Sequence, residues 1–233
     1  MIKENLEILQ QRISAKCKET GRNLSEVKLI AVSKYNPVKS IQEVFNSGYV
    51  NLGENKAQEF SEKAQIVKED VTWHFIGHLQ TNKVKLVVPY AEYIHSVETT
   101  KLANEINKRA ALIDKTQKIF LEVNTSGEES KFGLQAEDKI LEFAEFCKTL
   151  SSVDFCGLMT MAPYTDDEQV IRNCFRKVRE LKDMLSGRGF KITELSMGMT
   201  NDLELAIEEG ATMLRIGTAI FGQRDYSKTW KDL

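Results

Sequence analysis

The sequence predicts an α/β protein: a single TIM-type (β/α)8 barrel with an extra helix at its N-terminus. Two observations lead to this fold class. Eight short apolar runs alternate with amphipathic helical segments, as expected for a parallel sheet with helical crossovers. In addition, 233 residues is a usual length for one such barrel, and no Pro/Gly/Ser-rich linker divides the chain. We therefore expect residues 1–233 to form one domain, with residues 226–233 as a frayed polar tail.

The predicted elements begin with a helix. Its apolar residues recur at steps of three or four and form one stripe: Ile2, Leu6, Leu9, Ile13 and Cys17. Short apolar runs without a helical period predict strands at 28–34, 50–54, 72–77, 93–98, 118–125, 154–160, 192–197 and 212–218. Helices are predicted between them at 38–47, 55–68, 79–88, 99–112, 136–149, 166–185 and 200–209. An open, doubly wound sheet is the rival architecture, but eight units preceded by one helix favour the closed barrel.

The composition argues against several classes of function. Lys+Arg number 32 and Asp+Glu 34, so no overall positive field attracts nucleic acid or an anionic membrane. The N-terminal segment carries charges throughout, and no run approaches the ~20 apolar residues of a membrane span, so we expect a cytoplasmic protein. Four cysteines and three histidines are dispersed, which predicts buried reduced thiols and no metal site; the cysteines are Cys17, Cys147, Cys156 and Cys174.

The ends of the last two predicted strands carry the pattern of a phosphate site. In such barrels ligands bind at the C-terminal ends of the strands, and phosphate is often held by the loops after strands seven and eight. Gly198 and Gly217 let the backbone approach a ligand, and Ser196, Thr200 and Thr218 supply hydroxyls. Thr200 is also a predicted N-cap, so a helix starting near residue 201 would point its free N–H groups at the same place. The alternative is that these are ordinary turn and capping residues.

Two cationic residues stand near the ends of the first and the eighth predicted strands. Lys34 ends an apolar strand and should point into the barrel mouth, where burial disfavours its ammonium form, as imine formation with an aldehyde requires. Alternatively, Lys34 extends to solvent or pairs with Glu54. Arg215 lies two residues before Gly217. It would either join a buried ion pair or donate to a ring nitrogen, which it keeps unprotonated because arginine does not give up its proton.

Seven stretches spread over almost the whole chain resemble the pyridoxal phosphate homeostasis protein family. They are Ala31-Val-Ser-Lys34, Gly53-Glu-Asn55, His74-Phe-Ile-Gly-His-Leu-Gln-Thr-Asn-Lys83, Ser130-Lys-Phe-Gly133, Gly157-Leu-Met159, Ser196-Met-Gly-Met-Thr200 and Arg215-Ile-Gly-Thr-Ala-Ile-Phe-Gly222. The barrel of that family is similar to the N-terminal domain of fold-type III enzymes such as bacterial alanine racemase. The resemblance therefore implies a fold-type III barrel that binds pyridoxal 5'-phosphate (PLP).

The resemblance also implies a set of cofactor-binding residues: Lys34, Asn55, Ser196, Met197, Thr200, Arg215, Gly217 and Thr218. Lys34 would form a covalent Schiff base with PLP, Arg215 would face the pyridine nitrogen, and Asn55 would lie near the ring. The phosphate would be held by Ser196, Thr200, Gly217 and Thr218. Lys131 would add positive charge at the mouth. Position 200 departs from the pattern, since serine is expected there in many relatives, but the hydroxyl remains.

The resemblance implies supply or buffering of PLP rather than turnover. The sequence ends shortly after the last predicted strand, so we expect no second, β-rich domain of the kind that brings a tyrosine base to racemase-type sites. An arginine at the ring nitrogen also weakens the electron sink of the cofactor. We expect a non-catalytic monomer that exchanges PLP with PLP-dependent apoenzymes. The alternatives are a racemase-like PLP enzyme acting on amino acids and a binding module for another phosphorylated ligand.

Overall fold

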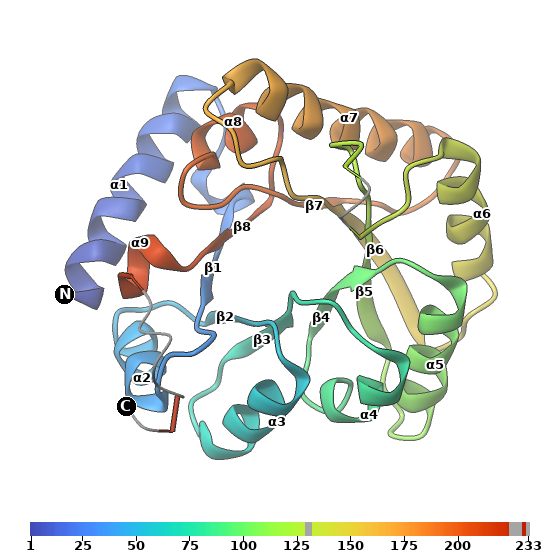
Figure 1. Ribbon diagram of the computed structural model, residues 1–233, viewed down its shortest axis with the longest axis horizontal. Helices are drawn as coiled ribbons and strands as arrows, with labels where there is room; N and C mark the ends of the chain where they lie inside the picture. Colours follow the sequence, from blue (N-terminus) through green and yellow to red (C-terminus); the bar gives the residue numbers. More distant parts are fainter. Residues whose placement is uncertain (129–131, 224–229, 232–233) are drawn as a thin grey trace.

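The strands form a closed ring in the computed structural model, which describes residues 1–128, 132–223 and 230–231. Within these ranges the strands are β1 (Lys28–Val32), β2 (Asn51–Glu54), β3 (Thr72–Phe75), β4 (Tyr93–Val97), β5 (Gln117–Glu122), β6 (Val153–Met159), β7 (Glu194–Ser196) and β8 (Met213–Ile216). They are parallel and pair in chain order, and β1 closes the ring against β8, with Leu29 opposite Leu214. The predicted TIM-type barrel is confirmed and the open sheet is wrong (Figure 1).

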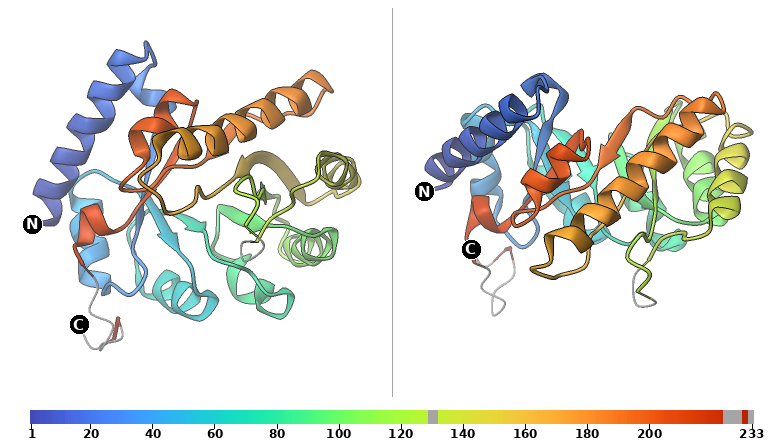
Figure 2. Two further views of the ribbon diagram at one scale, coloured as in Figure 1. Left: turned by 45° about the horizontal axis from the view of Figure 1, so that its top comes forward. Right: turned by 90° about the horizontal axis from the view of Figure 1, so that it is seen from above.

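Helices form an outer layer around this ring (Figure 1). The α-helices are α1 (Ile2–Glu19), α2 (Val38–Asn46), α3 (Ala57–Ile66), α4 (Val84–Val87), α5 (Thr100–Ala111), α6 (Glu137–Cys147), α7 (Glu168–Gly187), α8 (Leu203–Glu208) and α9 (Thr218–Phe221). Two short 3-10 helices are η1 (Leu24–Glu26) and η2 (Thr81–Lys83). The extra N-terminal helix is present as predicted. Its apolar stripe is buried, and α1 lies beside α8 and α9 (Figure 2).

Two helices differ from the prediction in a way that affects the site. The segment 79–88 is a 3-10 turn followed by the four-residue α4 rather than one continuous helix. After β7, the helix begins at Leu203, because the Asp202 carboxylate accepts a hydrogen bond from the backbone N–H of Met199 and closes a turn first. Asp202 is therefore the N-cap residue, and the prediction of Thr200 as N-cap is wrong. β8 also ends at Ile216, and residue 218 already belongs to α9.

The core has two parts, one outside and one inside the ring of strands. The larger part packs the helices against the outer face of the barrel. The smaller part fills the inside and consists of Ile30, Phe120, Cys156, Met159 and Met213. The four cysteines are buried, as predicted. No helix in the described ranges is long and apolar enough to cross a membrane.

Candidate functional site

A cavity of about 1000 Å³ opens where the barrel strands end and contains most of the predicted site. The predicted residues that line it are Lys34, Asn55, Thr200, Arg215, Gly217 and Thr218. Ser196 and Met197 do not line it, because both side chains are completely buried beneath the loop that follows β7. Lys131 lies outside the described residues, as do 226–229 and 232–233 of the expected tail. Residues from the ends of four different strands thus meet in one place.

Lys34 reaches the cavity because it continues the inward alternation of β1. Ile30 belongs to the core inside the barrel and Val32 lines the cavity, so the next residue of the same parity, Lys34, also faces inward. Its side chain is half-buried. The carboxylate of Glu54, the alternative partner considered for Lys34, forms an ion pair with Lys63 at 2.7 Å between Nζ and Oε1. The strand therefore delivers an amine to the barrel mouth.

The backbone turns sharply directly after Lys34. Tyr35 has a φ of 65°, in the left-handed region that costs a residue other than glycine about 1–2 kcal/mol. The turn carries further hydrogen bonds: Asn36 N–H donates to the Ser33 carbonyl at 3.0 Å, and Asn36 Nδ2 donates to the Lys34 carbonyl at 3.1 Å. Such strain persists only where surrounding contacts hold the backbone in place.

The loops after β7 and β8 come together next to the strand that carries Lys34, because β8 pairs with β1. The hydroxyl oxygens of Thr200 and Thr218 are 3.2 Å apart, and either group can donate to the other. Gly198 lets the loop after β7 pack closely against Ala206 of α8. Its φ is 93°, and a Cβ there would lie 2.5 Å from the Cβ of Ala206. Helix α8 has six residues and starts beyond the loop, so the hydroxyl pair, and not a helix N-terminus, is the polar feature of this wall.

Arg215 lies deep in the wall below these loops and is almost completely buried. Its Nη1 donates to the Ser196 hydroxyl at 2.6 Å and its Nη2 donates to the Thr160 carbonyl at 2.8 Å. Burial lowers the pKa of Arg215 to about 10, while the charges of Asp202 and Glu122 act in the opposite direction. The guanidinium therefore keeps its proton at neutral pH, and it presents hydrogen-bond donors to the cavity that it lines.

A chain of neutral polar groups continues from Ser196 across the inside of the barrel. The Ser196 hydroxyl lies 2.8 Å from His95 Nδ1, and His95 Nε2 lies 3.0 Å from His74 Nδ1. His74 Nε2 in turn lies 3.1 Å from Asn51 Oδ1. Burial lowers the pKa of His74 to about 3 and that of His95 well below its usual value, so both rings are neutral.

One assignment of protons satisfies this whole chain. Arg215 donates to Ser196, which donates to His95 Nδ1; His95 then donates from Nε2 to His74 Nδ1. His74 donates from Nε2 to Asn51. In this assignment each group donates to the next group further from Arg215. The guanidinium therefore donates to oxygen acceptors, those of Ser196 and Thr160. The dispersed histidines gave no sign of this contact in the sequence, because it depends on neighbouring strands placing them side by side.

Glu122 is a cavity residue that the sequence reasoning missed. It is the last residue of β5 and lies within the strand predicted at 118–125, but it was not among the predicted site residues. Burial raises its pKa to about 7, the nearby Glu98 adds to this effect, and Arg215 opposes it. Its carboxyl group therefore exchanges a proton near neutral pH. Asn55 also points to a ligand in this cavity, because it lines the cavity and its Oδ1 is buried without a hydrogen-bond partner.

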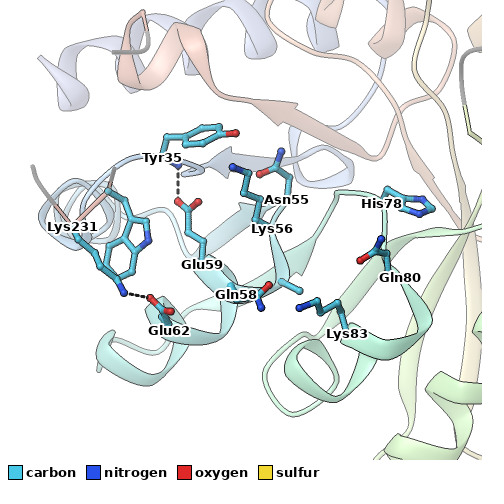
Figure 3. A pocket seen from close by; sticks show the side chains of 12 residues that line it. Tyr35, Asn55, Lys56, Gln58, Glu59, Glu62, His78, Gln80, Lys83 and Lys231 are labelled. Atoms are coloured by element: carbon cyan, nitrogen blue, oxygen red, sulfur yellow. Dashed lines mark hydrogen bonds and ion pairs between the residues drawn. The ribbon is translucent and has the colours of Figure 1, made fainter. Parts of the chain in front are cut away.

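A smaller cavity of about 630 Å³ adjoins the first beyond Asn55 and His78, which line both (Figure 3). Helix α3 forms one wall of it with Glu59, and Lys83 stands on another side. Among the described residues, neither Lys34 nor Arg215 lines this second cavity. The candidate site is therefore the larger cavity.

The larger cavity suits a small anion that carries an aldehyde and an aromatic ring nitrogen. Lys34 offers an amine, Thr200 and Thr218 offer hydroxyl donors, and Arg215 offers guanidinium donors. The unpartnered Oδ1 of Asn55 calls for a donor on the ligand, such as a ring hydroxyl. The polar groups of these residues therefore fit the aldehyde, phosphate, ring nitrogen and ring hydroxyl of PLP.

The comparisons with known proteins agree with this arrangement. The sequence profile described as "Alanine racemase, N-terminal domain" matches residues 2–225. The chain is 44% identical over 225 residues to the pyridoxal phosphate homeostasis protein of Aquifex aeolicus, covering 96% of this chain and 98% of that protein. A protein of unknown function from Bifidobacterium adolescentis superposes with a TM-score of 0.87 at 35% identity, covering 94% of each chain. PipY of Synechococcus elongatus, solved with PLP bound, superposes with a TM-score of 0.82 at 31% identity, covering 95% of this chain and 100% of PipY.

Proposed function

Because this chain belongs to the alanine racemase N-terminal domain family, and to the same family as the pyridoxal phosphate homeostasis proteins, we propose that it binds PLP for PLP homeostasis. Lys34 holds the cofactor as a Schiff base, and the protein buffers or delivers it in the cytoplasm without catalytic turnover. The observation that carries the proposal is the single cavity shared by the Lys34 amine, the hydroxyls of Thr200 and Thr218, and the Arg215 guanidinium. The PLP bound to PipY supports it.

The predicted polar residues that line the cavity each have a counterpart on the cofactor. The hydroxyls of Thr200 and Thr218, with the backbone of Gly217, bind the phosphate. Arg215 donates to the pyridine nitrogen, and Asn55 accepts from the ring hydroxyl. In the covalent step, Nζ of Lys34 bonds to the aldehyde carbon, and the carbonyl oxygen leaves as water with the two amine hydrogens. No oxidant or second substrate is needed.

Ser196 and Met197 act from below the cavity in this proposal. The Ser196 hydroxyl accepts from Arg215 and so orients the guanidinium. The Met197 N–H donates to the Met213 carbonyl at 3.2 Å, which ties the loop after β7 to β8. Both residues serve cofactor binding through a neighbour and not by contact with the phosphate.

Arg215 supports a carrier rather than a catalyst. PLP supplies an electron sink when its ring nitrogen is protonated, and a guanidinium that keeps its own proton leaves that nitrogen unprotonated. One observation favours the alternative of a PLP enzyme acting on amino acids: the Glu122 carboxyl lines the cavity and its pKa, raised by burial to about 7, suits proton exchange. Steady turnover of an amino acid that is lost in both Lys34→Ala and Glu122→Gln would establish the enzyme and overturn the carrier.

The test of the carrier begins with the covalent bond. Protein loaded with PLP is expected to show an imine absorbance band, and borohydride is expected to fix the cofactor on the peptide that contains Lys34. Lys34→Ala should lose the band and the label. Lys83→Ala is the matched control, because Lys83 lines the smaller cavity and not the larger one. Retention of the label by Lys34→Ala, or its loss in Lys83→Ala, would contradict the assignment.

Delivery is tested with a recipient. We propose that the protein is a monomer and passes PLP to PLP-dependent apoenzymes. Light scattering after gel filtration is expected to give the mass of one chain, 26.5 kDa. Loaded protein mixed with an apoenzyme should restore that enzyme's activity, and the carrier separated from the mixture should have lost its imine band. An unchanged band in the separated carrier would rule out delivery.

A further inference from the structure

Three hydrogen bonds, two of them to backbone groups, join a buried cluster to the residues on both sides of Lys34. On the N-terminal side, Lys63 Nζ donates to the Ser33 carbonyl at 2.9 Å, and the Ser33 hydroxyl donates to Glu54 Oε1 at 2.7 Å. On the C-terminal side, the Tyr35 N–H donates to Glu59 Oε1 at 2.6 Å. Figure 3 shows the Glu59 carboxylate pointing from α3 at the backbone of Tyr35. Lys34 thus lies between two fixed points.

The cluster that supplies these bonds is itself rigid. Lys63 Nζ lies 2.7 Å from Glu54 Oε1 and 2.7 Å from Glu59 Oε1, so one ammonium binds both carboxylates and the Ser33 carbonyl. Lys63 and Glu54 are completely buried and Glu59 nearly so. Because water cannot replace these partners, the groups stay together once the barrel is formed. Glu59 and Lys63 stand one turn apart on α3, and Glu54 ends β2.

The left-handed backbone conformation of Tyr35 explains why the cluster must hold this turn in place. A residue other than glycine at a φ of 65° tends to leave that conformation unless its neighbours hold it. The Tyr35 N–H is held by Glu59, and the ring of Tyr35 lies under the Lys56 ammonium, with Nζ 4.6 Å from the ring centroid. The direction in which Lys34 leaves the backbone depends on this turn, because Tyr35 is its next neighbour.

We propose that Lys63, Glu59 and Glu54 are positioning residues that aim Lys34 at the aldehyde of its ligand by holding the backbone of residues 33 to 35. This inference rests on the proposed function, since it assumes that the Lys34 amine forms a bond with PLP. The cluster acts on the covalent step, because its bonds go to residues 33 and 35 and not to the loops after β7 and β8 that we propose bind the phosphate. Misplacement of a reacting group by about 1 Å slows a reaction by up to about 100-fold.

The experiment separates bond formation from simple binding. Pyridoxine 5'-phosphate has an alcohol in place of the aldehyde, so its affinity reports the phosphate and ring contacts alone. The rate of the imine absorbance change after mixing with PLP reports the covalent step. In Lys63→Met we expect the rate of imine formation to fall about 10- to 100-fold, with the affinity for pyridoxine 5'-phosphate within about 2-fold of the wild-type value.

Lys115→Met is the matched control. Lys115 Nζ also donates to backbone carbonyls, those of Val88 and Ala91, but it does so beside the start of β4, at the other end of the barrel. This variant is expected to keep the wild-type rate and affinity. A wild-type rate in Lys63→Met overturns the proposal. An equal loss of rate and of pyridoxine 5'-phosphate affinity overturns it as well, since that result describes general damage to the cavity.

Glu59→Ala decides the question if Lys63→Met does not fold. It removes the acceptor for the Tyr35 N–H and leaves Lys63 paired with Glu54, so the remaining cluster is a single balanced ion pair. The same split between rate and affinity is expected, and its absence overturns the proposal. Failure of the proposed function has a different signature: the wild-type protein itself would form no bond between PLP and Lys34.

Discussion

Two neighbouring strands of the barrel, β1 and β8, hold their cationic side chains at the mouth by different means. Beneath Lys34, charged groups centred on Lys63 bind backbone atoms of the residues that flank the lysine. Beneath Arg215, neutral groups bind the guanidinium itself, through the Ser196 hydroxyl and the Thr160 carbonyl. One network fixes the base of a side chain, and the other fixes its tip.

The difference matches what each cation does in the proposed function. The lysine amine must lose its proton and form a bond, so the restraint acts on its backbone and sets the direction of the side chain. The arginine must keep its proton and donate, so acceptors on its guanidinium set the direction of its N–H groups. The comparison also predicts losses of stability on mutation that differ in size and pH dependences of opposite sign, which the following changes test in order of expected size.

Removal of the cation from the charged network should have the largest effect on stability. Lys63→Met leaves the carboxylates of Glu54 and Glu59 buried without their ammonium partner. We expect the free energy of unfolding to fall by about 3–5 kcal/mol, measured by urea denaturation at neutral pH. Lys115→Met, which removes hydrogen bonds without stranding a charge, should lose about 1 kcal/mol. Equal losses in the two variants would show that the Lys63 ammonium does not stabilise the buried carboxylates of Glu54 and Glu59.

The pH dependence of stability should change sign between the two networks, beginning with Glu54. Burial raises the folded-state pKa of Glu54 to about 7, and Glu59 adds to the effect while Lys63 opposes it. The folded state then binds a proton that the unfolded state has released, so this group's stabilising contribution is present below pH ~4.5 and is lost as the pH rises towards 7. Glu54→Gln removes that loss, which amounts to about 3 kcal/mol at most.

The check is a series of urea denaturations between pH 4.5 and 8. The free energy of unfolding of Glu54→Gln, measured relative to the wild-type protein, should rise with pH across this window. The exposed carboxylate of Glu142, which pairs with Lys139, provides the control variant Glu142→Gln. A flat difference between Glu54→Gln and the wild-type protein would mean that the Glu54 carboxyl titrates normally.

The neutral network should lose less stability on mutation, and its pH dependence should have the opposite sign. His95→Phe keeps a ring that can stack on Phe120 but strands His74 Nδ1 and the Ser196 hydroxyl, at a cost of about 1–3 kcal/mol. Because burial holds the pKa of His95 well below its usual value, the unfolded state binds a proton that the folded state does not. Wild-type stability therefore falls on this account as the pH drops below ~6.5.

His95→Phe removes this acid sensitivity. Its stability relative to the wild-type protein should accordingly rise as the pH falls below ~6.5, the reverse of the slope expected for Glu54→Gln. The same urea series measures both. Parallel slopes for the two variants would erase the distinction between a charged and a neutral network.

The smallest effect concerns the backbone at Tyr35. Glycine adopts a φ of 65° without steric penalty, whereas alanine does not. Tyr35→Gly should therefore be about 1 kcal/mol more stable than Tyr35→Ala, although both lose the tyrosine ring. Equal stabilities would indicate that the turn relaxes once the ring is removed, and that the buried cluster does not hold it.

Much of the site follows from the barrel topology alone. Lys34 was predicted to enter the mouth because a side chain that shares the parity of Ile30 and Val32 must face inward. Thr200 and Thr218 were predicted to converge because β7 and β8 are neighbours in a closed barrel. Both predictions depend only on the strand period and on strand order. Both agree with the structure, because strand period and strand order are properties of the barrel as a whole. The predicted start of the helix after β7 was wrong, because it depends on the local turn at Asp202.

The buried networks were missed for a different reason. Lys63 lies on the same helical face as the buried residues Ala57, Phe60 and Val67. The helical periodicity of the sequence alone could therefore have predicted that Lys63 is buried. Its carboxylate partners cannot be read from that periodicity. His74 and His95 carry no comparable signal, because a polar residue within a strand has no assigned partner until the register of the ring is known.

The sequence by itself determined the order of strands and helices, the closed barrel, and the identity of the side chains that reach its mouth. These follow from local periodicity and from the rule that parallel strands end at one edge. Only the tertiary structure decided what lies beneath Lys34 and Arg215 and which carboxyl groups keep their protons. Burial and the distance between charges control those properties, and both come into existence only when distant segments pack together.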